Sequence, residues 1–308
     1  MLNRFTIKQK FIILALVVLT PLFCLLGVNI QENNADIKVI RVELEGLDSI
    51  NSLIDLIGLI QNHRGLMNTY LSGDKSIQSK IMEIESKVDL SIADAQKHFK
   101  THPSAFRDDA SWKEFEIKWN DNIQNYQALN IQNNHFGAQD NFAGHTDFVN
   151  FLIESTTNIA DLSGLTLDPN ENTYYMIDTA ILKTPAMIES FAKTRGLGAG
   201  ILARKQLTVE EKSKLLILLN ELAIAEKRYQ HNLGVLKKYP EDSRIASEDI
   251  QAMVDAGDSL RQLTNTHILL PKTPDYDSVS FFKQATQNVN QGFDSYSKIK
   301  QTPAEYFE

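Results

Sequence analysis

The sequence predicts an all-α protein in which an N-terminal transmembrane helix is followed by two antiparallel four-helix bundles. Residues 11–28 form an uncharged apolar run, and an Arg-Gly-Leu tripeptide occurs twice, at residues 64–66 and 195–197. Between and after these features, apolar residues recur at steps of three and four, without the period-two alternation typical of β-strands. We therefore expect three segments: a cytoplasmic tip and anchor at 1–30, a first bundle at 31–167 and a second bundle at 168–308.

The composition is that of a folded protein with long helices. Apolar residues make up 43% of the chain and charged residues 23%, which argues against a disordered chain. The net charge of −8 argues against a general nucleic-acid binder, because phosphate contacts need a basic face. The single cysteine, Cys24, lies in the apolar N-terminal run. The remainder therefore has no disulfide framework and no thiolate for a metal site or a nucleophile.

Residues 11–28 are long enough to cross a membrane. These 18 residues span roughly 27 Å as a helix, close to the ~30 Å hydrocarbon core of a bilayer. Lys8 and Lys10 precede the run, and the first acidic residue, Glu32, follows it. The positive-inside rule therefore places the N-terminus in the cytoplasm and residues 31–308 on the opposite side. We expect an uncleaved anchor, because no Ala-x-Ala-like cleavage site follows the run.

Four apolar stripes predict the helices of the first bundle. They cover residues 37–60, 77–99, 112–126 and 140–162. Gly73-Asp74 is expected to end the first helix, and His102-Pro103 is expected to end the second.

Four further helices are predicted after the turn Asp168-Pro169-Asn170, in which Asp168 or Asn170 acts as the N-cap. They are expected at about residues 171–204, 208–238 (before Pro240), 246–264 and 278–300. The first of them should bend at Pro185, whose missing N–H interrupts the backbone hydrogen bonds. Thr208 and Glu211 have the spacing of a capping box, which predicts the start of the next helix.

The glycines between residues 196 and 200 superficially resemble a phosphate-binding loop. Such a loop follows a strand and carries a Lys-Ser/Thr pair, whereas these glycines lie within a predicted helix. We therefore interpret them as small residues that let a neighbouring helix approach closely.

The histidines do not form a convincing metal site. His98 and His102 stand at i and i+4, but His102 precedes a proline and no acidic ligand is in register. His135 and His145 flank a polar loop, and all four are interpreted as surface histidines. No Ser-His-Asp or paired-carboxylate arrangement follows from the spacing, so we expect neither an enzyme nor a bound cofactor.

Arg64 and Arg195, which begin the two Arg-Gly-Leu tripeptides, are the strongest candidates for ligand contacts. Each is predicted late in a long helix, beside a glycine and close to apolar residues. A guanidinium held against a bundle interior, with space left by the glycine, is a good receptor for a carboxylate or another oxyanion. The alternative is a structural salt bridge to an acidic residue on a facing helix.

Tyr174 and Tyr175 are candidate walls of a ligand pocket. Adjacent residues on a helix point about 100° apart, so the two rings should not both face one pocket. We expect one tyrosine in the core and the other at a pocket or an interface.

Three stretches resemble a known family. MLNRFTIKQKFIILALVVLTPL resembles the first membrane helix of bacterial methyl-accepting chemotaxis receptors and related sensor proteins. GLTLDPNENTYYMIDTAILKTPAMIESFAKTRGLGAG resembles a stretch in the extracytoplasmic sensor regions of such receptors. QNHRGLMNTYLSGD is similar to the Arg-Gly motif of all-helical nitrate/nitrite-sensing-type and helical bimodular sensor domains, although His63 stands where an acidic residue is expected.

The resemblance implies the ligand-binding region of a chemoreceptor in the bacterial inner membrane, with residues 31–308 in the periplasm. We expect a small anion to bind between helices, in contact with Arg64, Arg195, Tyr174 and Tyr175, and we expect a homodimer. Binding would favour one packing of the helices over another. The sequence has no second membrane helix and no output region with methylation heptads. We therefore expect either the N-terminal portion of a longer receptor or a truncated form.

Two other functions remain open at this point. The same sensor region can belong to a histidine kinase or a diguanylate cyclase whose catalytic domain is absent from this sequence. A non-sensory, membrane-anchored helical scaffold that binds another protein is the third possibility, and it predicts a long exposed apolar stripe.

Overall fold

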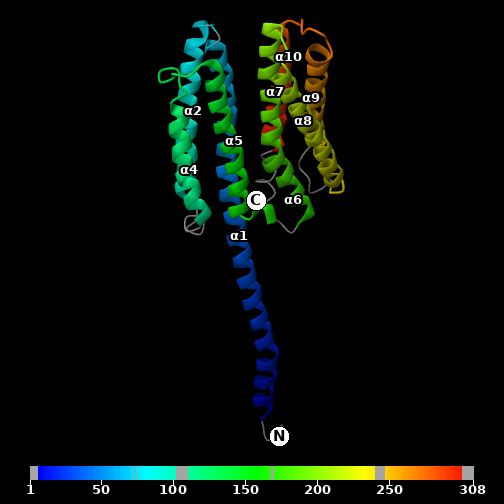
Figure 1. Ribbon diagram of the computed structural model, residues 1–308. Helices are drawn as coiled ribbons and strands as arrows, with labels where there is room; N and C mark the ends of the chain where they lie inside the picture. Colours follow the sequence, from blue (N-terminus) through cyan, green and yellow to red (C-terminus); the bar gives the residue numbers. More distant parts are fainter. Residues whose placement is uncertain are drawn as a thin grey trace.

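The computed structural model describes residues 6–71, 73, 75–101, 110–167, 170–239 and 247–299. Every regular element within these ranges is helical, and none is a strand (Figure 1). The prediction of an all-α protein is therefore confirmed for this part of the chain. Several predicted boundaries lie outside the described residues: Asp74, His102-Pro103, Asp168-Pro169, Pro240, Ala246 and Lys300.

Helix α1 (Ile7–Leu71) is one uninterrupted helix of 65 residues, roughly 100 Å long at 1.5 Å per residue. Its N-terminal part extends beyond the other helices as a lone rod (Figure 1). By length and composition this part is able to cross a membrane, and its apolar side chains are mostly exposed. The sequence analysis placed the anchor and the first bundle helix in separate segments, whereas the structure joins them in a single element that includes Pro21.

The C-terminal half of α1 belongs to what we call the first helix group. Its other members are α2 (Gln78–Thr101), α4 (Ala110–Gln127) and α5 (Ala138–Leu162), with short 3-10 turns at η2 (Lys75–Ile77) and η3 (Leu165–Leu167). Helix α1 packs against both α2 and α5, and α4 packs against α5. The buried faces are the predicted apolar stripes, and they include Ile50, Val88 and Leu152.

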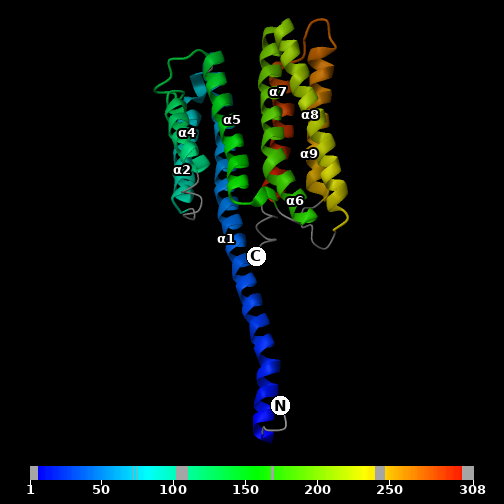
Figure 2. The ribbon, with the colours of Figure 1, turned by 60° about the horizontal axis from the view of Figure 1, so that its bottom comes forward.

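The second helix group follows η3 in the chain. It contains α6 (Glu171–Ile177), η4 (Asp178–Lys183), α7 (Thr184–Arg204), α8 (Val209–Leu236), α9 (Ser247–Thr264), η5 (Asn265–Leu269) and α10 (Ser278–Ile299). Helices α7 and α9 each pack against both α8 and α10 (Figure 2). The predicted capping box is confirmed, because Thr208 and Glu211 each accept a hydrogen bond from the backbone N–H of the other at 3.1 Å.

The helix predicted at residues 171–204 contains a π-helical segment, η4, directly before Pro185. The backbone N–H of Thr184 donates to the carbonyl of Thr179, five residues earlier, and Thr184 Oγ1 donates to the same carbonyl at 2.7 Å. Pro185 has no N–H to donate to the carbonyl of Ile181, four residues earlier, and the wider turn lies directly before this interruption. The expected irregularity lies at the predicted place, and it takes the form of a π-helical segment.

The two groups meet along α1, α5 and α7, where glycines permit close packing. A Cβ atom added to Gly196 would lie 3.3 Å from the ring of Phe142, and one added to Gly58 would lie 3.2 Å from Phe293. Within the second group, a Cβ atom on Gly198 would lie 2.6 Å from the ring of Phe281. The interpretation of this glycine run as helix-packing residues is therefore confirmed for Gly196 and Gly198.

Candidate ligand-binding sites

Arg64 lies where the two helix groups meet, and only 2% of its surface is exposed. Its guanidinium makes a bidentate pair with Glu189 of α7, at 2.7 Å to Oε1 and 3.0 Å to Oε2. It also donates to Thr146 Oγ1 of α5 at 2.9 Å and lies 4.8 Å from the centre of the Phe142 ring. The structure therefore contains the salt bridge to a facing helix that was the alternative interpretation of this arginine.

Both carboxylate oxygens of Glu189 are contacted by polar side chains from the two helix groups. Gln61 Nε2 donates to its Oε2 at 2.8 Å, and Lys193 Nζ lies 3.4 Å from its Oε1. Removing one partner of a buried ion pair costs about 3–5 kcal/mol, because the other charge is left uncompensated. An anionic ligand would have to displace Glu189 to reach Arg64. The ligand contact at Arg64 stays a prediction, and it requires that the ligand displace Glu189.

Arg195 has a similar setting in the second helix group but no carboxylate partner within the described residues. It lies 5.0 Å from the centre of the Phe282 ring, and its terminal nitrogen donates to Thr286 Oγ1 at 3.4 Å. Its Nε is buried without a hydrogen-bond partner among the residues described. Burial, and secondarily the positive charge of Arg64, lower the pKa of Arg195 to about 10. The side chain is therefore still charged at neutral pH, with donors to spare.

The surroundings of the two arginines repeat. Each guanidinium contacts a phenylalanine and, four residues later on the same helix, a threonine. The helix is α5 in the first group and α10 in the second. The sequence carries this signal as two Phe-x-x-x-Thr spacings, FAGHT at 142–146 and FKQAT at 282–286. The sequence analysis singled out the repeated arginines but missed both the Phe-x-x-x-Thr spacings and Glu189.

Tyr174 and Tyr175 both line a groove of about 420 Å³ between α6, η4 and α8, which we call the tyrosine groove. The expectation that they could not face one pocket is wrong, whereas Tyr175 also packs against the hydrophobic core, as expected for one of the two. Tyr174 is 40% exposed, and Tyr175 is half-buried. The two rings pack edge to face with centroids 5.2 Å apart, and Tyr175 Oη lies 3.4 Å from His231 Nε2. The two side chains leave the helix in different directions, but both are long enough for their rings to meet and to line the same groove.

The tyrosine groove carries an excess of positive charge. Its charged lining residues are Asp178, Lys183, Lys227 and Arg228. Lys183 pairs with Asp178, which also accepts a hydrogen bond from Asn232 Nδ2 at 2.8 Å. Lys227 and Arg228 are exposed and form no ion pair with any residue that the structure describes. The groove therefore offers two free cations and two aromatic rings.

A buried polar network that the sequence analysis missed links all four helices of the first group. His63 Nε2 lies 3.1 Å from the carboxylate of Glu85, and His63 Nδ1 lies 3.0 Å from Tyr126 Oη and 2.9 Å from His145 Nε2. His145 Nδ1 donates to the carbonyl of Asn141 at 2.8 Å. His145 is therefore a core residue, and its interpretation as a surface histidine is wrong. Burial, followed by the charge of His63, lowers its pKa to about 3.

The described residues contain no group of three or more histidine, cysteine or acidic side chains placed to hold a metal ion. His98 lies 3.6 Å from Asp94 of the same helix, and its predicted partner, His102, lies outside the described residues.

Comparison of the chain with protein-family models, with curated proteins and with solved structures finds no match.

Proposed function

We propose that this chain is the ligand-binding region of a membrane-anchored bacterial sensor of the chemoreceptor type, and that it binds a small anion. In this proposal α1 anchors the protein in the inner membrane with its N-terminus in the cytoplasm. The helix groups are two antiparallel four-helix bundles in the periplasm, and the protein acts as a homodimer without catalytic activity. The repeated arrangement of arginine, phenylalanine and threonine supports two related bundles.

The tyrosine groove is the observation that carries the proposal. It brings together both predicted tyrosines, and it places Lys227 and Arg228 beside them without carboxylate partners among the described residues. Its volume of about 420 Å³ falls in the range of small-molecule sites, roughly 300–1,000 Å³. A carboxylate or nitrate ion would pair with the free cations, while the tyrosine rings would cover the rest of the ligand.

Arg195 provides a second anion contact in the same proposal. Its buried Nε has no partner within the described chain, and an unmet charged donor in a buried position is costly. A ligand carboxylate between α7 and α10 would supply what Glu189 supplies to Arg64. Because α7 joins the two helix groups, an anion at Arg195 would act on the helix that connects them.

The test is thermal unfolding of the full chain in lipid nanodiscs, with nitrate, acetate and succinate as probes. A ligand at about 100 times its Kd stabilises the folded state by about 2.7 kcal/mol, which a melting curve resolves. We expect at least one anion to raise the Tm of the wild type. The double variant Lys227→Ala/Arg228→Ala should abolish this rise, whereas Lys212→Ala, which removes an exposed cation on the same helix far from the groove, should not.

The variants also separate the two anion sites. If Arg195→Met abolishes the rise and the double variant keeps it, the anion binds at Arg195. If none of the three anions raises the Tm of the wild type, the proposal is wrong.

A non-sensory scaffold is the second candidate function, and the surface of α8 favours it. This helix exposes four aliphatic side chains at spacings of seven and eight residues, Val209, Leu216, Ile217 and Ile224. An exposed apolar stripe of this kind is typical of a surface that binds another helix. Replacing Leu216 and Ile217 with serine should dissociate a complex that uses this stripe and should leave anion binding unchanged, as measured by sedimentation velocity and thermal unfolding in parallel.

A further inference from the structure

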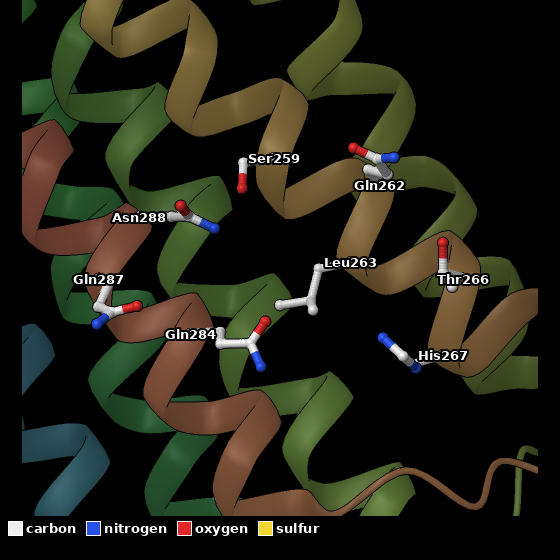
Figure 3. A pocket seen from close by; sticks show the side chains of 8 residues that line it. All are labelled: Ser259, Gln262, Leu263, Thr266, His267, Gln284, Gln287 and Asn288. Carbon is white, nitrogen blue, oxygen red and sulfur yellow. The ribbon is translucent and has the colours of Figure 1, made fainter.

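We propose that a second groove, between α9 and α10, binds a small neutral polyhydroxylated molecule of about the size of a monosaccharide. This groove, which we call the amide groove, is distinct from the tyrosine groove and has a volume of about 350 Å³. Six of its lining side chains are amides or hydroxyls: Ser259, Gln262, Thr266, Gln284, Gln287 and Asn288 (Figure 3). The two remaining lining residues are Leu263 and His267.

Asn288 is the residue that points to a ligand. Only 9% of its surface is exposed, and its side-chain amide makes no hydrogen bond to any residue that the structure describes, although the amide atoms keep some contact with solvent in the groove. A side-chain amide with so little exposure has few contacts with water, and most such amides in native proteins have a hydrogen-bond partner. Asn288 lines the groove from α10, on the side where Ser259 approaches from α9 (Figure 3). A bound hydroxyl group would satisfy both its donor and its acceptor.

The chemistry of the lining selects the class of ligand. None of the lining residues carries a fixed charge, so a charged ligand would lose its hydration without gaining a counter-charge. An apolar ligand would leave the amides unpaired. A hydroxyl group both donates and accepts, as a side-chain amide does, so a molecule with several hydroxyl groups can satisfy glutamine, asparagine, serine and threonine side chains together.

One end of the amide groove is held in place before any ligand arrives. His267 stacks on Tyr276 with ring centroids 3.8 Å apart, and Tyr276 Oη accepts a hydrogen bond from Gln284 Nε2 at 2.6 Å. Thr266 and His267 lie in the π-helical segment η5, and such segments occur frequently at functional sites. The pre-ordered ring and amide lower the ordering cost of binding.

The test is isothermal titration calorimetry of the full chain in lipid nanodiscs, since maltoside detergents would present the same chemistry as the probes. The probes are glucose, galactose, ribose and N-acetylglucosamine, each up to about 10 mM, so that a site with a Kd of about 1 mM approaches saturation. We expect saturable binding of at least one probe. Asn288→Ala should weaken this binding by roughly tenfold or more, the loss of one to two good hydrogen bonds.

Asn290→Ala is the matched control, since Asn290 is an exposed amide on the same helix outside the groove. Its binding should equal that of the wild type. If Asn288→Ala fails to fold, the double variant Gln262→Ala/Gln284→Ala tests the same groove, because both side chains are exposed. The variant Lys227→Ala/Arg228→Ala should bind the neutral probe normally, so this result is independent of the anion proposal.

Three results would overturn the inference. The first is that no probe binds saturably to the wild type. The second is that binding persists unchanged in Asn288→Ala and in Gln262→Ala/Gln284→Ala. The third is that Asn288→Ala abolishes self-association of the protein but no probe binds, which would assign the amide groove to a second copy of the chain.

Discussion

Arg64 and Arg195 differ in one respect that outweighs their similarities. Both begin an Arg-Gly-Leu tripeptide, and both contact a phenylalanine and a threonine on the last helix of their group. Arg64 has the carboxylate of Glu189, whereas Arg195 has no acidic partner within the described chain and keeps a buried Nε unpaired. The repeated arrangement thus joins the helix groups at Arg64 and leaves Arg195 without a carboxylate partner among the described residues.

The residue directly before the threonine sharpens the contrast between the two sites. In FAGHT of α5 it is His145, which joins His63 and Tyr126 in a buried polar network. In FKQAT of α10 the same position holds Ala285, which is also fully buried. The position before the threonine therefore holds a buried polar side chain in the first group and a buried apolar side chain in the second. We infer that the first site is structural and the second is the one available to a ligand.

Glu189→Ala should have the largest effect on stability, because it leaves Arg64 as isolated as Arg195. We expect the free energy of unfolding to fall by about 3–5 kcal/mol, the cost of an uncompensated buried charge. Urea unfolding monitored by circular dichroism measures it. Glu210→Ala is the control, since its pair with Lys214 at 2.7 Å is exposed, and surface pairs contribute about 0–1 kcal/mol. Equal losses in both variants would contradict a structural role for Glu189.

The polar network in the first group should make the protein sensitive to acid. Burial lowers the pKa of His145 to about 3, against an ordinary value of 6.5. Between these values the unfolded chain binds a proton that the folded chain does not, so stability falls as the pH decreases from about 6.5 toward about 3. His145→Gln should flatten this dependence in urea titrations at a series of pH values, whereas His135→Gln, at an exposed site, should leave it unchanged. A steeper acid dependence in His145→Gln would refute the assignment.

Replacing Gly65, next to Arg64, and Gly198, three residues after Arg195, with alanine should change the stability of the protein in opposite directions. A Cβ atom on Gly65 meets nothing within 4 Å, while one on Gly198 lies 2.6 Å from the Phe281 ring. Gly65→Ala should stabilise the protein by about 0.5–1 kcal/mol through helix propensity. Gly198→Ala should destabilise it by about 1–3 kcal/mol through overpacking. Thermal unfolding of the two variants measures both changes in stability. An increase in stability in Gly198→Ala would show that α7 and α10 are loosely packed.

Helical periodicity predicted the fold class and nearly every helix, because long apolar stripes follow directly from local spacing. The capping box at Thr208 and the irregularity near Pro185 were also predictable, since each depends on neighbouring residues. Glu189 was not, because its partner Arg64 lies 125 residues away, and nothing local marks a pairing between helices. The expectation that Tyr174 and Tyr175 could not line one pocket was wrong for a related reason. The direction in which a side chain leaves a helix does not determine where the end of a long side chain lies.

Arg195→Met should have the smallest effect on stability, and it tests the comparison most directly. An unpaired guanidinium gains little from burial, so an unbranched apolar side chain of similar length should match it within about 1 kcal/mol or exceed it. Arg64→Met should lose more, up to about 3–5 kcal/mol, because it leaves the buried Glu189 with only Lys193 and Gln61 as partners. Urea unfolding of both variants without added anion measures the difference. A loss above about 2 kcal/mol in Arg195→Met would mean that Arg195 is held by a stabilising partner, and its availability to a ligand would then be untenable.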